Sequence, residues 1–498
     1  MAIKPFFGKL YAARVSRKNR WWKNHPIEAQ KKVFESLIRQ AKNTVFGKEH
    51  GFSNIKSYED FRSFVPIRDY ESFCVYIERI LEGEKDVLWP GLPLYFCKTS
   101  GTTSGAKYIP ISKRSLAYQI KCAKDAILNY INETSDARFL NGKNIFIQGS
   151  PELDFSKSAP LGRLSGIVAH HIPWYLKRSN APSFKTNCIE DWEKKIDAII
   201  DETSSQNMTL ISGIPPWVQM YFEKLKKRTG KAIKDVFPNY SLMIYGGVNF
   251  DPYKKRFLDL VGKNVASVET YPASEGFIAY QDRQDDEGLL LCVNHGIFYE
   301  FVEREFFFTE NPQRISLKDV QLKKDYVIIL NTNAGLWGYN IGDTIRFVSK
   351  RPYRIIVSGR IKHFTSAFGE HVIAKEVDEA MKEVIKNCGA VVTEFHVAPQ
   401  VNPSSGLPYH EWFIEFYSPQ KNKICFANDL DLAMQKQNVY YKDLVQGGVL
   451  RPLVVSCVQR NGFINYMKSK GALGGQNKPP RLANNRKLAD GLSLYLDD

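Results

Sequence analysis

Between residues 143 and 271, short apolar runs alternate with stretches of helical periodicity. The apolar runs lie at 143–148, 209–213, 240–247 and 265–271, and the helical stretches lie at 189–202, 215–228 and 251–262. This alternation is typical of a sheet whose two faces are covered by helices. The sequence therefore predicts an α/β fold for this part of the chain.

Three helices are expected before this region. Residues 26–46 place apolar side chains on one helical face, and Gly47 is expected to end that helix. A short helix is predicted over 68–82, and Ser112 is expected to open a longer one over 112–133.

The pattern changes at residue 277. Strand-like runs follow one another as far as 357 without helical periodicity, which predicts an antiparallel sheet or a distorted barrel. Helical patterns return at 373–387 and 428–437, with strand-like runs at 390–397, 411–417 and 451–458. We therefore expect a large N-terminal domain over 1–358 and a smaller α+β domain over 359–498.

Composition excludes several classes of protein. No apolar run reaches the roughly 18 residues that a membrane-spanning helix needs, and no signal-peptide pattern opens the chain, so a cytoplasmic location is expected. The eight cysteines are scattered without a C-x-x-C pair. This favours buried thiols in a reducing compartment and argues against a zinc site.

The net charge of +16 raises nucleic acid as a partner. Because the basic residues are widely spread and no nucleic-acid-binding motif is present, small anionic substrates fit this charge better. Trp21 and Trp22 lie in a basic segment, where they either touch a membrane surface or, as is more common, pack against the body of the protein.

The stretch LYFCKTSGTTSGAKYIP at 94–110 combines glycines, hydroxyl side chains and one lysine. Backbone N–H groups and hydroxyls in such a segment can surround the oxygens of a polyphosphate. The residues that carry this hypothesis are Ser100, Gly101, Thr102, Thr103, Gly105 and Lys107. The spacing fits neither G-x-x-x-x-G-K-[ST] nor G-x-G-x-x-G, and a polar surface loop is the alternative.

S-G-T-T-S-G-x-K at 100–107 resembles the phosphate loop of the adenylate-forming superfamily, which includes acyl-CoA synthetases and luciferases. YPASEG at 271–276 and YNIGD at 339–343 match later motifs of that superfamily in the same order. Together with FTSAFGEH at 364–371 and NKPPR at 477–481, they resemble one branch, the auxin-responsive acyl acid amido synthetases, here as a bacterial-type member. Plant members of that family join hormone acids to amino acids.

YPASEG follows a predicted strand, and strand ends are where α/β sheets bind ligands. The Glu275 carboxylate suits Mg²⁺, which bridges triphosphate oxygens. Tyr271 offers a ring on which adenine can stack, and Ser274 a hydrogen bond to phosphate or to the acyl carboxylate. Without the resemblance, a turn with a solvated glutamate is the simpler interpretation.

The resemblance implies further contacts. Gly246 and Gly247 would let adenine or the acyl group lie against the backbone, although a tight turn explains them equally well. Asp343 would accept hydrogen bonds from ribose, or else cap a turn, and Arg360 would contact the nucleotide. Lys478 would be a mobile catalytic lysine, or an ordinary surface lysine. Lys362 and His363 stand where the superfamily usually has a hinge aspartate, so the hinge residue stays open.

The resemblance implies an ATP-dependent acyl acid–amido synthetase. ATP and Mg²⁺ would be its cofactors, a carboxylic acid and an amino acid or other amine its substrates, and AMP and pyrophosphate its products. Two alternatives remain: an adenylate-forming ligase with coenzyme A as the acceptor, and a non-catalytic nucleotide-binding relative. The intact Lys107, Glu275 and Asp343 argue against the second.

Overall fold

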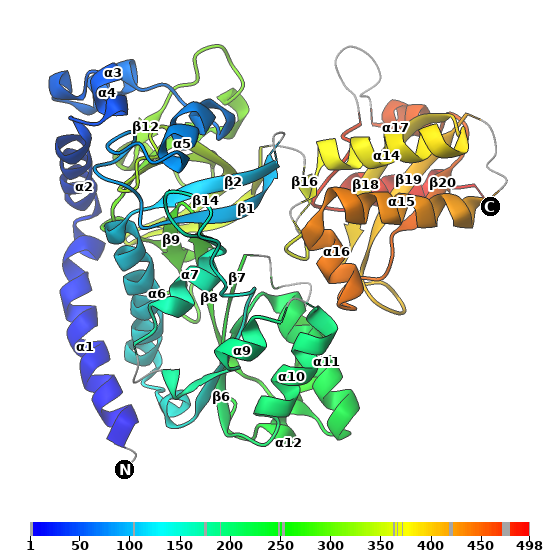
Figure 1. Cartoon of the computed structure of the whole chain (residues 1–498), viewed down its shortest axis with the longest axis horizontal. Coiled ribbons are helices and arrows are strands. Elements are labelled where there is room, and N and C mark those ends of the chain that lie inside the picture. Colours follow the sequence, from blue (N-terminus) through cyan, green and yellow to red (C-terminus); the bar gives the residue numbers. More distant parts are fainter. Residues whose placement is uncertain are drawn as a thin grey trace.

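The structure is a computed structural model of the 498-residue chain. It describes residues 3–497 apart from 103–104, 174–176, 190, 248–249, 251–253, 362–363, 366, 371, 418–421 and 471–478. Figure 1 shows a large body that ends in helix α1 on one side and a smaller C-terminal unit on the other.

Helices line the edge of the molecule that is farthest from the C-terminal unit (Figure 1). They are α1 (Ile3–Asn24), α2 (Pro26–Ala41), α3 (Val45–Glu49) and α4 (Tyr58–Phe64), whereas α5 (Cys74–Leu81) lies further toward the centre of the molecule. The single helix predicted over 26–46 is wrong beyond Ala41, because Thr44 caps a new helix by accepting a hydrogen bond from the Gly47 backbone N–H. Gly47 therefore lies inside α3 and does not end α2.

The glycine-rich stretch forms a β-hairpin. β1 (Tyr95–Thr102) pairs antiparallel with β2 (Gly105–Ile111), and β4 (Leu161–Gly162) joins the other side of β1. The stretch is therefore not a surface loop that leads directly into a helix, since β2 intervenes before the helix. That helix, α6 (Lys113–Thr134), begins as predicted, with Ser112 accepting a hydrogen bond from the Ser115 backbone N–H.

One twelve-stranded sheet forms the centre of the body, in the order β12-β11-β13-β14-β15-β10-β9-β8-β7-β6-β3-β5. Its parallel strands are β3 (Lys143–Ile147), β5 (Asn180–Ala181), β6 (Met208–Gly213), β7 (Leu242–Gly246) and β8 (Ala266–Ala273). Its antiparallel strands are β9 (Gly276–Tyr280), β10 (Leu289–Leu291), β11 (Ile297–Glu303), β12 (Ile315–Ser316), β13 (Asp325–Thr332), β14 (Tyr339–Lys350) and β15 (Tyr353–Arg360). The region of successive strands is thus an antiparallel sheet, continuous with the parallel one.

Helices cover one face of the parallel strands, and the two layers share one apolar core. The helices are α9 (Phe184–Asn187), α10 (Trp192–Thr203), α11 (Pro215–Thr229), α12 (Ile233–Val236) and α13 (Lys254–Val261), whereas α7 (Leu164–His170) packs against β1 of the hairpin. Ile211 and Met243 of the sheet pack with Tyr221 and Phe257 of the helices. On the other face, α6 packs against β8 and β9.

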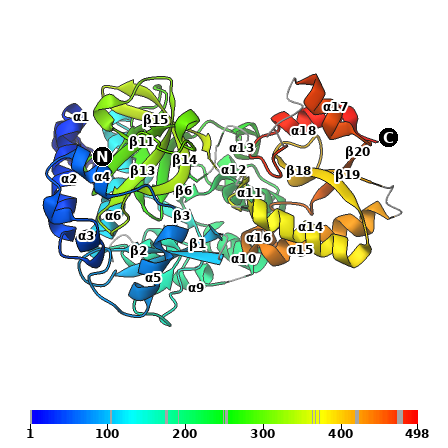
Figure 2. The same ribbon diagram turned by 90° about the horizontal axis from the view of Figure 1, so that it is seen from above.

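The C-terminal unit is a three-stranded sheet between two pairs of helices (Figure 2). The strands are β18 (Val392–Gln400), β19 (Tyr409–Phe416) and β20 (Val454–Val458); α14 (Ala374–Cys388) and α15 (Lys423–Gln437) lie on one face, and α17 (Gly462–Ser469) and α18 (Lys487–Leu492) on the other. α16 (Val439–Gln446) follows α15, and the short pair β16 (Phe364–Thr365) and β17 (Val372–Ile373) precedes the unit.

In the described ranges, no helix has both the length and the apolar character needed to cross a bilayer.

Candidate functional site

The hairpin places Lys107 beside Tyr70. Thr99 of β1 lies opposite Lys107 of β2, and the Lys107 Nζ lies 5.6 Å from the centre of the Tyr70 ring. The Tyr70 hydroxyl accepts a 2.7 Å hydrogen bond from the Tyr108 backbone N–H, and burial raises the pKa of Tyr70 to about 12. The base of the hairpin is therefore held against the N-terminal helices. Ser100, Gly101 and Thr102 lie at the end of β1 and Gly105 at the start of β2, whereas Thr103 is outside the described residues.

The YPASEG segment forms the turn between β8 and β9, and the hairpin contacts it directly. The Cys97 thiol of β1 donates a hydrogen bond of 3.1 Å to the Ser274 hydroxyl. From α6, the Gln119 side chain donates to the Ser274 carbonyl at 3.4 Å. Three separate elements thus meet at Ser274.

Glu275 lies beside Tyr339, the first residue of the YNIGD motif. Burial, and then the Glu275 carboxylate, raises the pKa of Tyr339. Glu275 also lines a cavity of about 10 Å³ together with Ser115 and Asn333, which is room for one water molecule. A wider groove of about 600 Å³ lies elsewhere, lined by Glu303, Lys324 and neighbouring residues, and none of the predicted site residues that the structure describes lines it.

Tyr271 and Asp343 are joined by a hydrogen bond from the tyrosine hydroxyl to the carboxylate. Asp343 is buried, at 5% exposure, and it lies opposite Arg360 where β14 pairs with β15. Tyr271, Asp343 and the backbone of Arg360 therefore share one end of the central sheet. This proximity requires the antiparallel strands to continue the parallel sheet, which is the arrangement observed.

Gly246 is the last residue of β7 and Gly247 follows it, and the two glycines differ in their surroundings. A Cβ on Gly246 would lie 2.3 Å from the Thr270 carbonyl oxygen of β8, so the close approach of the two strands excludes any side chain. Gly247 has a φ of +84°, and no described residue outside its chain neighbours lies within 4 Å of the position of a Cβ. The backbone at Gly247 is thus accessible to a ligand, next to the strand that carries Tyr271.

Lys478, Lys362 and His363 lie outside the described residues. The chain that follows Lys478 is fixed to β18. The Pro480 carbonyl lies 2.7 Å from His396 Nδ1, and the Arg481 carbonyl accepts a 2.9 Å hydrogen bond from the Val397 backbone N–H.

The C-terminal unit contacts the body through a small polar patch and a shared apolar core. The Arg163 guanidinium lies 4.7 Å from the centre of the Tyr440 ring and 3.8 Å from the Asp443 carboxylate, both on α16. Phe368 and Val372 belong to the same core cluster as the helices of the parallel sheet.

Comparison with known proteins identifies three consecutive segments of one family. Residues 20–265 match the GH3 family N-terminal domain, 290–360 the GH3 family central domain, and 375–487 the GH3 family C-terminal domain. This chain belongs to the GH3 family.

Relatives of this GH3 chain carry the names of amino-acid-conjugating enzymes. An indole-3-acetic acid-amido synthetase, GH3.3 of Arabidopsis thaliana, is 20% identical over 537 residues, which cover 91% of this chain and 88% of the relative. A jasmonoyl–L-amino acid synthetase, JAR4 of Nicotiana attenuata, is 20% identical over 383 residues, which cover 64% of this chain and 66%, just under two thirds, of the relative.

Among solved structures, the GH3.15 acyl acid amido synthetase has a similar fold, with a TM-score of 0.61 and 15% identity over 98% of this chain and 97% of that one. The predicted family and the predicted fold class, a large α/β N-terminal part with a smaller α+β C-terminal part, are both confirmed.

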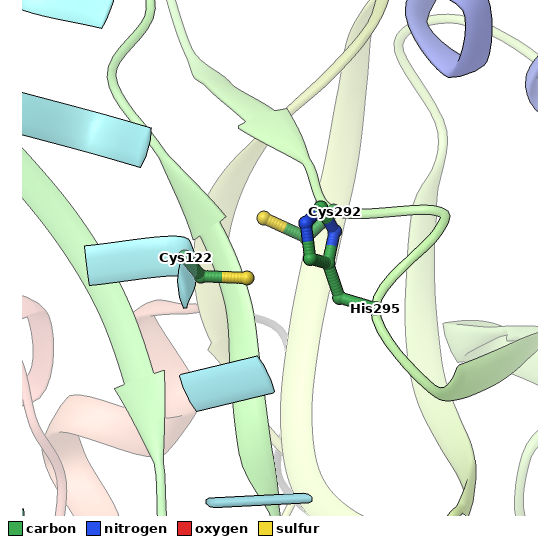
Figure 3. Close-up of side chains that lie close together, drawn as sticks. All are labelled: Cys122, Cys292 and His295. Carbon is green, nitrogen blue, oxygen red and sulfur yellow. The ribbon is translucent and has the colours of Figure 1, made fainter. Parts of the chain in front are cut away.

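One cluster of side chains in this GH3 chain escaped the sequence analysis (Figure 3). Cys122 of α6 lies with Cys292 and His295, and the potential ligand atoms of all three lie within 4.8 Å of one another. The Lys121 ammonium lies 3.0 Å from His295 Nε2 and 2.5 Å from Asp125 Oδ2. The cationic side chain of Lys121 is therefore already adjacent to this histidine. The separation of Cys122 from Cys292 along the chain left no local spacing by which the cluster could have been predicted.

All eight cysteines are free. The prediction of buried thiols holds for Cys97, Cys122, Cys292 and Cys457 but is wrong for Cys388 and Cys425, which are exposed on α14 and α15.

Proposed function

We propose that this protein is an ATP-dependent acyl acid–amido synthetase. The observation that carries the proposal is the meeting of three distant motifs at one end of the sheet. Tyr271 donates a hydrogen bond to Asp343, and Cys97 of the glycine-rich hairpin donates one to Ser274. Glu275 lies beside Tyr339. Membership of the GH3 family, together with the names of the relatives, supports the chemistry.

In the first step, an oxygen of the substrate carboxylate attacks the α-phosphorus of ATP, the bond to the β-phosphate oxygen breaks, and pyrophosphate leaves. In the second step, the amine nitrogen attacks the carbonyl of the acyl-adenylate, AMP leaves with the bonding electrons, and the amine loses a proton. Most of the acceleration in such reactions comes from positioning and charge stabilisation.

The donor set at the site suits a magnesium–nucleotide complex. Glu275 provides a carboxylate oxygen among the hydroxyls of Ser274 and Tyr339, and oxygen ligands are those that Mg²⁺ prefers. When bound, Mg²⁺ would offset the charge of the triphosphate. Ser100, Thr102, Thr103 and Lys107 would bind the phosphates, Tyr271 would stack on adenine, and Asp343 would accept the ribose hydroxyls. The accessible backbone at Gly247 would border the adenine or the acyl group.

We also propose a division into domains at 1–358 and 359–498, with the smaller one rotating between the two steps. Rotation would separate Arg163 from Tyr440 and Asp443, which it contacts across the two parts. Arg360 lies at the junction of the two domains and would contact the nucleotide. Lys478 would enter the site in the first step. No residue is assigned as the base that accepts the amine proton.

The test measures pyrophosphate release from ATP and Mg²⁺ with a panel of carboxylic acids, each with and without mixed amino acids. Acid-dependent release that amino acids accelerate, with amide detected by mass spectrometry, is the expected result. Glu275→Gln should reduce the rate by about a hundredfold or more. Glu310→Gln, which changes an exposed carboxylate away from the site, should not.

Two results would contradict the proposal. Acceleration by coenzyme A and not by amino acids would identify a thioester-forming ligase. Binding of ATP without turnover of any acid on a broad panel would favour a nucleotide-binding relative that is not a catalyst.

A further inference from the structure

The first three turns of α1 expose a group of large apolar side chains. Five large side chains there are between 47 and 74% exposed: Ile3, Phe6, Phe7, Leu10 and Tyr11. Soluble proteins rarely expose contiguous apolar groups of this size without a partner. We therefore expect another molecule to cover these side chains.

These side chains are not needed to hold α1 on the body, because a different face does that. Ala12 and Trp22 are buried, and the Asn19 amide donates a 2.9 Å hydrogen bond to Asp125 of α6. At Gly8 the helix lies so close to Leu140 that an added Cβ would be 2.5 Å from the Leu140 Cδ1. Trp22 thus packs against the body, as one of the two interpretations predicted, whereas Trp21 is 38% exposed.

The charge of this segment is entirely positive. Residues 1–27 contain no Asp or Glu, and the first acidic residue is Glu28. Seven basic residues lie in α1, of which all but the last are exposed: Lys4, Lys9, Arg14, Arg17, Lys18, Arg20 and Lys23. Basic residues therefore flank the apolar turns and continue along the outer surface of the helix.

We propose that α1 docks this protein on the surface of anionic lipid bilayers. Phe, Leu and Trp side chains combined with lysines and arginines are typical of helices that lie in the interface of a membrane. The aromatic turns would enter the boundary between headgroups and acyl chains, and the basic residues would contact lipid phosphates.

Two other occupants fit less well. A second copy of the chain docked through the same face would bring the six exposed cations of each α1 together. Nucleic acid would neutralise these cations but would leave the phenylalanines uncovered. The anionic bilayer satisfies both the charge and the apolar groups.

The position of α1 is compatible with docking. It lies along the edge of the molecule that is farthest from the C-terminal unit (Figure 1). A bilayer held there would lie on the side of the molecule away from the C-terminal unit. The proposal is independent of the proposed enzymatic activity.

The test is co-sedimentation of the full chain with vesicles of phosphatidylcholine, alone or mixed with phosphatidylglycerol in equal parts. Binding to the mixed vesicles should be at least about tenfold stronger and should weaken as salt rises. A triple variant, Lys4→Gln with Lys9→Gln and Arg14→Gln, should lower the partition coefficient about a hundredfold, because each basic residue contributes about fivefold. The matched control, Lys226→Gln with Lys227→Gln and Lys231→Gln, should bind as the native chain does.

A second set of variants tests whether the apolar side chains of α1 contribute to vesicle binding. Phe6→Ser with Phe7→Ser and Leu10→Ser should also abolish binding, whereas Phe306→Ser with Phe308→Ser, which changes exposed side chains elsewhere, should not. All five of these side chains are at least half exposed, and circular dichroism would verify that each variant folds.

Equal sedimentation with both kinds of vesicle, or equal binding by the charge variant and its control, would overturn the proposal. So would self-association that the apolar variant removes in the absence of vesicle binding, which would identify a second copy as the partner. Salt-sensitive binding to duplex DNA that the apolar variant leaves intact, without vesicle binding, would identify nucleic acid instead.

Discussion

The Tyr271 hydroxyl donates a hydrogen bond to the Asp343 carboxylate, and this bond joins two segments that are 72 residues apart in the chain. Asp343 is thereby held in place at the end of the sheet before any ligand arrives. A carboxylate that is already oriented loses less conformational freedom when it accepts the hydroxyls of a ribose.

The first prediction tests this pair with AMP as the ligand. Asp343→Asn should weaken AMP binding by about 10- to 100-fold, because hydrogen bonds to a charged group contribute about 1.5–3 kcal/mol. Tyr271→Phe keeps the ring and removes only the hydroxyl, so a smaller loss of about two- to tenfold is expected. Isothermal titration calorimetry would measure both, and unchanged affinity in Asp343→Asn would remove ribose binding from this residue.

The second prediction compares substitutions of Gly246, the last residue of β7, and of Gly247, which follows it. Gly246→Ala should unfold or strongly destabilise the protein, because its Cβ would lie 2.3 Å from the Thr270 carbonyl oxygen. Gly247→Ala meets no neighbour among the described residues but takes a left-handed φ of +84°, which costs about 1 kcal/mol. Urea unfolding should show this order, and a marked loss of AMP binding in the folded Gly247→Ala variant would indicate that a ligand lies against that backbone.

The third prediction concerns a buried ion pair that fixes the N-terminal helices to the sheet. Arg314 lies 3.3 Å from Glu300 of β11 and donates hydrogen bonds to the carbonyls of Arg62 and Val65, at 2.8 and 2.6 Å. Arg314→Met would leave the fully buried Glu300 without this partner and should reduce the free energy of unfolding by about 3–5 kcal/mol.

Lys382→Met is the control for that experiment, because it breaks an exposed pair with Glu379 on α14 and should change the unfolding free energy by less than about 0.5 kcal/mol. Similar effects of the two substitutions would contradict the role assigned to Arg314.

The fourth prediction follows from the pKa of Lys195, which burial, and then the nearby Arg163, lowers from 10.5 to about 8. Its ammonium donates to the carbonyls of Gln148 and Asn187, at 3.0 and 2.6 Å. Between pH 8 and about 10.4 the unfolded chain holds this proton and the folded chain has released it, so folding stability rises with pH across that window.

Relative to Lys195→Met, the native protein should therefore gain up to about 3 kcal/mol between pH 7 and pH 10. Urea unfolding at several pH values would measure the difference between the two proteins. A difference that stays constant with pH would show that the Lys195 pKa is not lowered.

The fifth prediction concerns thiol reactivity. Burial raises the pKa of Cys97 to about 12, although its bond to Ser274 acts in the opposite direction. At pH 8 this thiol stays protonated, and only a thiolate attacks an alkylating agent. Iodoacetamide should modify the exposed Cys388 and Cys425 and leave Cys97 intact, as read by peptide mass spectrometry. In urea all eight cysteines should react, and modification of Cys97 under native conditions would contradict its burial.

Helices and strands with strong periodicity were predictable from the sequence. The predicted helix at 215–228 is α11 (Pro215–Thr229), and the predicted strand at 209–213 is β6 (Met208–Gly213). Local patterns suffice there because the buried faces repeat at the helical or strand period.

The hairpin was not predictable in this way. Ser100 and Thr102 have the composition of a loop, and they lie in a strand because β2 provides an antiparallel partner. Such pairing depends on tertiary context, which overrides local propensity.

The motifs of the candidate site were recognisable, but their contacts were not. Nothing near Tyr271 in the sequence indicates that β14 would bring Asp343 to it, since this depends on how the antiparallel strands join the sheet. The bond from Cys97 to Ser274 and the approach of Cys122 to Cys292 likewise connect residues that are far apart in the chain.

The position of β10 in the central sheet has a consequence for synthesis of the chain. β10 lies between β9, which precedes it, and β15, whose Arg354 and Ile355 pair with Leu290 and Leu289. The ribosome synthesises the chain from the N-terminus, so one edge of β10 stays unpaired until more than sixty further residues have been made and β15 emerges. A nascent chain that stalls before residue 353 would expose that edge, and unpaired strand edges are templates for aggregation.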